Sequence, residues 1–112
     1  MPEPSPAAVY AEHCRRGELA YQVGPGGAAV FYPRAGLEWR VSAGLGTVYA
    51  TTIVHRRGED PYNVALIDLD EGFRMMSRVE GLPPEDVRIG MRVRVRFVDD
   101  GEDHPLPVFV TA

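Results

Sequence analysis

The side chains best suited to ligand chemistry in this sequence are its arginines. All 12 cationic residues are Arg, although the 112-residue chain carries a net charge of −4. A guanidinium group presents a planar fork of N–H donors that matches phosphate and carboxylate oxygens. The absence of Lys has a simpler explanation in the base composition of the genome. The candidate ligand-binding set, suited to the phosphates of a nucleotide-like ligand, is Arg56, Arg57, Arg74 and Arg78.

The other reactive side chains lack the neighbours that catalysis or metal binding requires. His55 ends a predicted strand with no nucleophile or carboxylate pair beside it, and Cys14 falls on a predicted helix. A structural zinc site needs four thiolate or imidazole ligands within tetrahedral reach. One cysteine and three scattered histidines do not provide them. We therefore expect no catalytic residue and no metal site.

Composition places the chain among ordinary single-domain globular proteins. With 45% hydrophobic and 25% charged residues, it has enough apolar side chains for one core, and no apolar run approaches a membrane span of about 18 residues. The N-terminus lacks the features of a signal peptide, so we expect a soluble protein in the cytoplasm. The acidic balance argues against nonspecific binding to a polyanion.

The first third of the chain predicts a small helical and extended unit. Residues 1–6 are proline-rich and read as a disordered tail. Good helix formers follow and stop before a glycine, which indicates a short helix. The expected elements after the tail are a helix over 7–16, an extended piece over 19–23, a glycine-rich loop over 24–27 and a short strand over 28–32.

The remaining residues predict a small β-barrel. The run 39–55 is rich in β-formers and is interrupted at Gly44 and Gly46, which predicts one bent strand that serves two sides of a nearly closed sheet. Further strands are expected over 62–69, 73–79, 91–97 and 108–111, with a very short helix between the third and fourth strands. Five strands with that insertion are the plan of an OB-fold, a partly open Greek-key barrel. An SH3-like barrel is the alternative, and it does not need the helix.

Alternation along two of these strands predicts which side chains enter the core. Phe73, Met75, Ser77 and Val79 share one face of their strand, and we expect that face to point inward, with Arg74, Met76 and Arg78 outward. Met91, Val93, Val95 and Phe97 are likewise expected inward, with Arg92, Arg94 and Arg96 outward. In OB-folds the usual ligand surface includes the second and third strands and the loop after the first, where the four candidate arginines fall.

Five segments, in this order and spacing, resemble the OB-fold proteins of unknown-function family 35 from bacteria and archaea. They are YAEHCRRGEL, FYPR, LEWRVSAGLGTVYATTIVH, VALIDLDEGFRMMSRV and PEDVRIGMRVRVRF, and they cover most of residues 10–97. Members of that family usually carry a rubredoxin-like zinc ribbon before the barrel, with one C-x-x-C pair near 23–27 and a second between FYPR and LEW. Neither pair is present here, so we expect a degenerate, metal-free ribbon reduced to a hairpin or loop.

The resemblance implies a domain plan and a function. It divides the chain into a tail over 1–6, an N-terminal helix with the ribbon remnant over 7–36, and an OB-fold barrel over 37–112. It implies a noncatalytic accessory subunit of an acyl-CoA-processing enzyme in lipid or related metabolism, with a thiolase-like or hydratase-like partner. The four candidate arginines would then touch CoA phosphates, and no bound cofactor is expected.

Two other functions remain open on the sequence alone. A single-stranded nucleic-acid-binding module would use Trp39, Tyr49, Tyr62 and Phe73 for base stacking. The acidic loop over 99–107 argues against it, so nucleic acid is not the expected partner. A self-associating structural domain would instead cover apolar surface around Val30, Phe31 and Tyr32 with a second copy.

Overall fold

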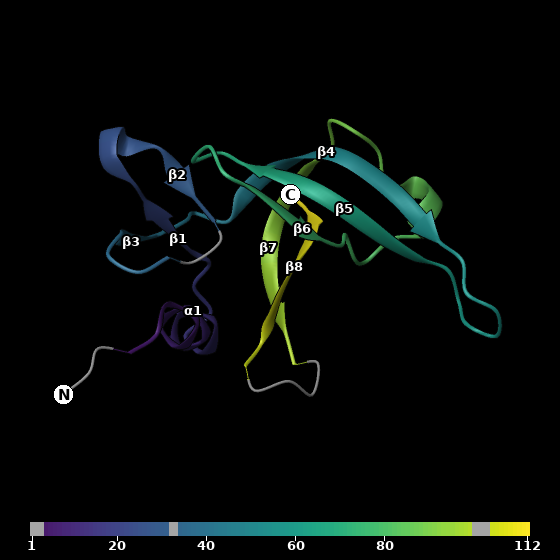
Figure 1. Ribbon diagram of the computed structural model, residues 1–112. Coiled ribbons are helices and arrows are strands. Elements are labelled where there is room, and N and C mark those ends of the chain that lie inside the picture. The colour runs from purple at the N-terminus through teal and green to yellow at the C-terminus, as the bar shows by residue number, and fades with distance from the viewer. Residues whose placement is uncertain (1–3, 32–33, 100–103) are drawn as a thin grey trace.

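The chain folds into two antiparallel sheets, one at each end of the molecule. The computed structural model describes residues 4–31, 34–99 and 104–112. Its elements are α1 (Pro6–Arg15), β1 (Ala20–Val23), η1 (Pro25–Gly27), β2 (Ala29–Val30), β3 (Glu38–Val41), β4 (Leu45–Val54), β5 (Tyr62–Leu69), β6 (Arg74–Ser77), η2 (Pro84–Asp86), β7 (Arg92–Val98) and β8 (Leu106–Thr111). The strand orders are β2-β1-β3 and β6-β5-β4-β7-β8. Figure 1 shows α1 beside the first sheet and the second sheet curling away from it.

The five-stranded sheet forms the predicted OB-fold barrel. Its two edges meet just beyond β6, where the Phe109 N–H donates to the Arg78 carbonyl (2.9 Å) and the Glu80 N–H donates to the Phe109 carbonyl (2.7 Å). The short 3₁₀ helix η2 lies between the third and fourth barrel strands, as an OB-fold requires and an SH3-like barrel does not. The mainly β fold class and the five barrel strands are therefore confirmed.

The core lies between the inward faces of the barrel strands. Burial along β5 alternates strictly from Asn63 to Leu69, with every second side chain buried. Phe73 and Met75 are buried, whereas Arg74 and Met76 are exposed, so the predicted inward face is correct there. Val93 of β7 is fully buried, while Val95 and Phe97 on the same strand and Met91 just before it pack against the core from partly buried positions.

The long bent strand predicted over 39–55 is in fact two strands in two different sheets. β3 pairs with β1, β4 pairs with β5 and β7, and residues 42–44 connect them. Gly44 has a φ of 77°, and a side chain at this position would run into Val95. The glycine therefore permits both the turn and the close approach of β7. The break was predicted at the right place, but the part before it belongs to the N-terminal sheet rather than to the barrel.

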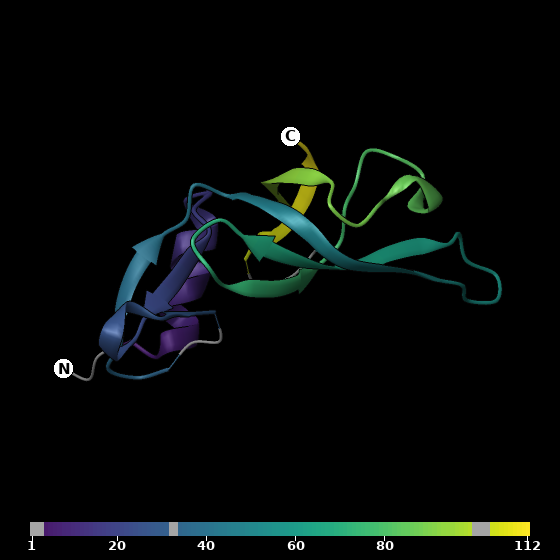
Figure 2. The ribbon, with the colours of Figure 1, turned by 90° about the horizontal axis from the view of Figure 1, so that it is seen from above.

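The N-terminal unit is more regular than the hairpin or loop that was expected. It is a three-stranded antiparallel sheet covered by α1 (Figure 2). The helix begins at Pro6, inside the segment expected to be a tail, because the Ser5 hydroxyl accepts from the Ala8 N–H (3.2 Å) and caps it. Residues 1–3, Tyr32 and the middle of the acidic loop, 100–103, lie outside the described residues. In the described part of the chain, no helix is long and apolar enough to span a membrane.

The β5–β6 turn joins the two sheets. The Phe73 ring stacks on Tyr21 of β1 (4.8 Å between centroids) and on Phe31 (5.6 Å). Two residues earlier, the Glu71 carboxylate accepts from the Ser42 hydroxyl (2.6 Å) and from the Ala43 N–H (2.8 Å). The turn therefore holds both the N-terminal sheet and the connection that leads from it into the barrel.

A buried amide holds the N-terminal sheet together. The side chain of Gln22 on β1 is 1% exposed. Its Nε2 donates to the Arg34 carbonyl and its Oε1 accepts from the Arg34 N–H, both at 2.7 Å. This paired contact ties β1 to the segment that precedes β3, across 12 residues of sequence.

We expect the substitution Gln22→Ala to lower the free energy of unfolding by about 1 to 3 kcal/mol, because two Arg34 backbone groups lose their partners and a cavity opens. Chemical denaturation followed by circular dichroism measures the change. Arg34→Ala is the matched control, since it keeps the backbone groups that bind Gln22, and it should cost well under 1 kcal/mol. Equal losses in the two variants would contradict this role for the amide.

Candidate functional site

The outward face of β4, β5 and β6 carries the first of the candidate arginines. Arg74 lies directly across from Asp68 in the sheet, and its Nε and Nη2 donate to the two carboxylate oxygens (2.6 and 3.2 Å). The guanidinium also lies flat over the Tyr49 ring, 3.4 Å from its centroid. Because its charge is neutralised and its plane is covered on one side, Arg74 is a weaker phosphate ligand than its sequence position suggested.

The other candidate arginines lie toward the opposite end of the β5–β6 hairpin. The Arg78 Nε donates to Glu80 (2.6 Å), and the Arg56 guanidinium sits 5.8 Å from the centre of the Tyr62 ring. Arg57 is exposed in the loop between β4 and β5. Arg78 is four residues from Arg74, about 13 Å along an extended strand. The structure thus brings Arg56 and Arg78 to the Tyr62 end and leaves Arg74 apart from them.

An apolar hollow opens beside Tyr62 and Arg78. It has a volume of about 260 Å³ and lies between β5, β6 and β8. Its walls are mostly apolar, and the residues that line it are Tyr62, Asn63, Val64, Met76, Ser77, Arg78, Leu106, Pro107 and Val108. The hollow is smaller than the 300–1,000 Å³ typical of small-molecule sites. Alternation along the strand predicts that Met76 lies on the outer face, but it does not reveal the hollow between β6 and β8 that Met76 lines.

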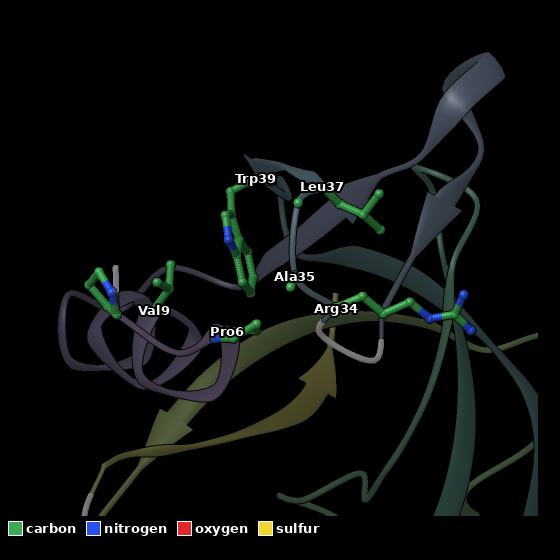
Figure 3. Close-up of a pocket in the computed structure, with 8 residues that line it drawn as sticks. Pro6, Val9, Arg34, Ala35, Leu37 and Trp39 are labelled. Carbon is green, nitrogen blue, oxygen red and sulfur yellow. The ribbon is translucent and has the colours of Figure 1, made fainter. Parts of the chain in front are cut away.

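A second hollow lies between α1 and the segment before β3 (Figure 3). Pro6, Val9, Ala35 and Trp39 line it. Figure 3 shows the Trp39 indole facing the helix, whereas the Arg34 side chain points away from α1. The Trp39 ring also packs on His13, 5.8 Å between ring centres. These contacts are those of a packed helix–sheet junction, and Arg34 is the one charged residue among the described residues that line the hollow.

The side chains considered for catalysis are dispersed in the fold. Cys14 is buried in α1, and burial raises the pKa of its thiol, as burial also raises the pKa of the neighbouring Tyr10 hydroxyl. His55 is exposed after the end of β4. Across residues 4–31, 34–99 and 104–112 no three His, Cys, Asp or Glu side chains gather closely enough to hold a metal ion. Among the aromatic residues considered for base stacking, Phe73 is buried in the core and unavailable, which corrects that expectation.

A second arginine of the barrel sheet, Arg92, is paired with a carboxylate, that of Asp70. Arg92 of β7 donates to both carboxylate oxygens of Asp70 (2.7 and 2.8 Å) and to the Thr47 hydroxyl (3.0 Å). The hydrogen bonds from Arg92 lower the pKa of the Asp70 carboxyl from its ordinary value of 3.8. The next two outward residues of β7, Arg94 and Arg96, are exposed.

The fold and this surface define a class of protein: an OB-fold barrel with an N-terminal antiparallel sheet. Comparison with known proteins agrees. Residues 39–98 match the family model described as ChsH2, C-terminal OB-fold domain. The chain therefore belongs to the family of ChsH2 C-terminal OB-fold domains, and the resemblance to unknown-function family 35 is confirmed by relatives that carry that name.

Similarity to curated proteins covers part of each relative. The chain is 39% identical over 69 residues to a DUF35 domain-containing scaffold protein of Methanocaldococcus jannaschii, over 54% of this chain and 49% of that protein. It is 36% identical over 67 residues to the 3-oxo-4,17-pregnadiene-20-carboxyl-CoA hydratase alpha subunit of Mycobacterium tuberculosis, over 56% of this chain and 22% of that one. The chain thus matches about half or less of the length of these relatives.

Similarity to a solved structure covers almost the whole chain. The fold matches a chain of the Ltp2-ChsH2(DUF35) aldolase with a TM-score of 0.80 and 26% sequence identity, over 99% of this chain and 98% of that one. The match therefore includes the N-terminal helix and sheet as well as the barrel.

We expect the Asp70–Arg92 pair to make folding stability dependent on pH in the acid range. A lowered carboxyl pKa contributes stability that is present above the unfolded value of 3.8 and is lost as pH falls through the lower folded value. Thermal unfolding of the wild type and Asp70→Asn should therefore differ near neutral pH and converge in acid. Asp60→Asn, in the exposed loop after β4, is the control and should follow the wild type. A difference between wild type and Asp70→Asn that stays constant down to pH 2 would contradict this origin.

Proposed function

We propose that this protein is a noncatalytic accessory subunit that helps to assemble an acyl-CoA-processing enzyme with a thiolase-like or hydratase-like partner. The observation that carries the proposal is the match, over nearly the full length of both chains, to the ChsH2(DUF35) component of an aldolase. Two partial relatives are named as hydratase alpha subunits, and a third is named as a scaffold protein. The dispersed positions of Cys14 and His55 agree with a subunit whose chemistry belongs to its partner.

The surface of the barrel supports a protein partner. Exposed apolar side chains lie on the outer strands and on the loop before β7, with Met76 64% exposed and Ile89 71% exposed. These two side chains belong to separate segments of the chain, and each is an apolar position available to a partner. The outward charges nearby are internally paired, as in Arg74 with Asp68, so a partner need not neutralise them.

Contact with CoA is a finer part of the same proposal. Of the four candidate arginines, Arg74 and Arg78 would have to leave Asp68 and Glu80 to bind a phosphate. Arg56 rests on an aromatic ring, and Arg57 has no ion pair with the described residues. Arg56 and Arg57 are therefore the better candidates for a CoA phosphate at the edge of a partner's channel. Location in the cytoplasm and self-association stay predictions.

Affinity capture of the tagged protein from its native cells tests the main proposal. We expect a thiolase-like or hydratase-like enzyme to be recovered in a near-equal molar amount and to be identified by mass spectrometry. Recovery of nucleic acid, or of no enzyme at all, would contradict the proposal. Neighbouring genes provide an independent check, because subunits of one enzyme are commonly encoded together.

The CoA contact is tested on the recovered complex. We expect the double substitution Arg56→Ala/Arg57→Ala to weaken CoA binding about tenfold, which corresponds to about 1.4 kcal/mol for lost charge-assisted hydrogen bonds. Isothermal titration calorimetry measures the affinity. Arg94→Ala/Arg96→Ala is the matched control, since it removes two exposed arginines from another strand. An equal loss in both double variants would indicate a general charge effect and contradict a specific contact.

A further inference from the structure

The edge of the barrel sheet at β6 leaves backbone hydrogen-bonding groups without a partner strand. The Leu69 N–H donates to the Phe73 carbonyl (2.8 Å), which fixes residues 69 and 73 as a hydrogen-bonded pair. Pairing then alternates along the antiparallel ladder, so Met75 and Ser77 bond to β5, whereas Arg74 and Met76 turn their N–H and C=O groups the other way.

Backbone hydrogen bonds farther along the chain confirm this alternation. The Arg78 carbonyl and the Glu80 N–H, which continue the outward-facing series, both bond to Phe109 of β8. The backbone hydrogen bonds that close the barrel begin at residue 78, and the Ser77 hydroxyl also donates to the Pro107 carbonyl of β8 (3.0 Å). Among the described residues, the backbone groups of Arg74 and Met76 bond to no segment on their outward side. The open edge is therefore two residues of outward-facing backbone long.

The features that usually guard an edge strand are weak here. Natural edges are blunted by charge, proline or bulges that discourage pairing with another chain. β6 has no proline, and its one charged side chain, Arg74, is neutralised by Asp68 and lies over Tyr49. Met76 follows on the same face and is 64% exposed. The shortness of the strand and the approach of β8 at Ser77 limit pairing to residues 74–76.

The apolar hollow described above opens where β6 and β8 diverge, beside this edge. Met76 and Ser77 form one wall and Leu106 to Val108 form another. An extended segment paired with β6 would direct alternate side chains to the outer face of the sheet, next to the hollow. An apolar side chain at such a position would fill it.

From the free edge and the adjoining hollow, we infer that β6 receives an extended segment of the enzyme partner as an added sixth strand of the barrel sheet. The inference rests on the proposed function. A second copy of this chain is a poorer occupant, because two outward residues on each side give at most four hydrogen bonds. Four backbone hydrogen bonds contribute no more than the lowest estimate of the cost of association, so they do not hold a dimer together by themselves. A larger partner adds contacts elsewhere on the barrel.

The test uses the complex of this protein with the enzyme recovered by affinity capture. Met76→Pro removes an N–H that points away from β5, so the β5–β6 ladder is retained, and edge strands tolerate proline at such positions. We expect this variant to bind the enzyme about tenfold more weakly or worse, with a thermal unfolding midpoint close to that of the wild type. Met76→Ala, which keeps the N–H, should lose less affinity than Met76→Pro.

Val41→Pro is the matched control. The Ser42 N–H donates to the Leu19 carbonyl, so Val41 likewise faces the open edge of the other sheet. The Val41→Pro variant should bind the enzyme with the same affinity as the wild type. Hydrogen exchange provides a readout independent of proline: the amides of Arg74 and Met76 should become protected in the wild-type complex.

The outcomes separate this inference from the proposed function. Recovery of an enzyme whose affinity is unchanged by Met76→Pro, with amides 74 and 76 still exchanging freely, would overturn strand addition and leave the accessory role standing. Loss of binding in Val41→Pro but not in Met76→Pro would also overturn it. A wild-type protein that recovers no enzyme would overturn both. A stable homodimer disrupted by Met76→Pro would show that the occupant is a second copy and overturn the assignment to an enzyme.

Discussion

The structure depends on the packing of one aromatic ring, that of Phe73 at the turn between β5 and β6. The ring is 4% exposed and stacks on Tyr21 and Phe31, so it joins the end of the barrel to the N-terminal sheet within one apolar core. Glu71 in the same turn holds the connecting segment in place. Its carboxylate accepts hydrogen bonds from the Ser42 hydroxyl and the Ala43 N–H, where the chain passes from one sheet to the other. Aromatic stacking adds apolar attraction, and the charge-assisted hydrogen bonds fix the position of the connecting backbone.

Much of the barrel could be predicted from the sequence because its strands are half-buried. Alternation at Phe73, Met75 and Val93 identifies the inward faces, and a strand with one buried face has only one acceptable register. The division of the 39–55 run between two sheets could not be predicted in the same way. Both halves have high β-propensity, and the pairing partner of β3 is β1, some 20 residues earlier in the chain, which no local pattern specifies.

The candidate site was predicted only in part, for a related reason. Alternation correctly placed Arg74 and Arg78 outward, but the availability of their guanidinium groups depends on cross-strand and turn contacts. Arg74 faces Asp68 because of the β5–β6 register, and Arg92 meets Asp70 from 22 residues away. Counting arginines therefore overestimates the charge available to a ligand. The exposure of Met76 and the hollow beside it follow from the divergence of β6 and β8, which is a property of barrel closure.

The N-terminal sheet stands where the resembled family usually carries a zinc ribbon, and it forms with a single cysteine in the whole chain. The two segments where the family carries its cysteine pairs lie after β1 and before β3. Gln22 of β1, just before the first segment, reaches across to the Arg34 backbone, just before the second, so an amide connects the chain beside both segments. A side-chain amide can satisfy one N–H and one C=O at once and needs no oxidation state or metal supply. Such a contact is far weaker than a structural zinc site, and it suffices here because Phe73 and α1 already hold the sheet from both faces. Packing against the barrel through Phe73 therefore contributes to the stability of the N-terminal sheet.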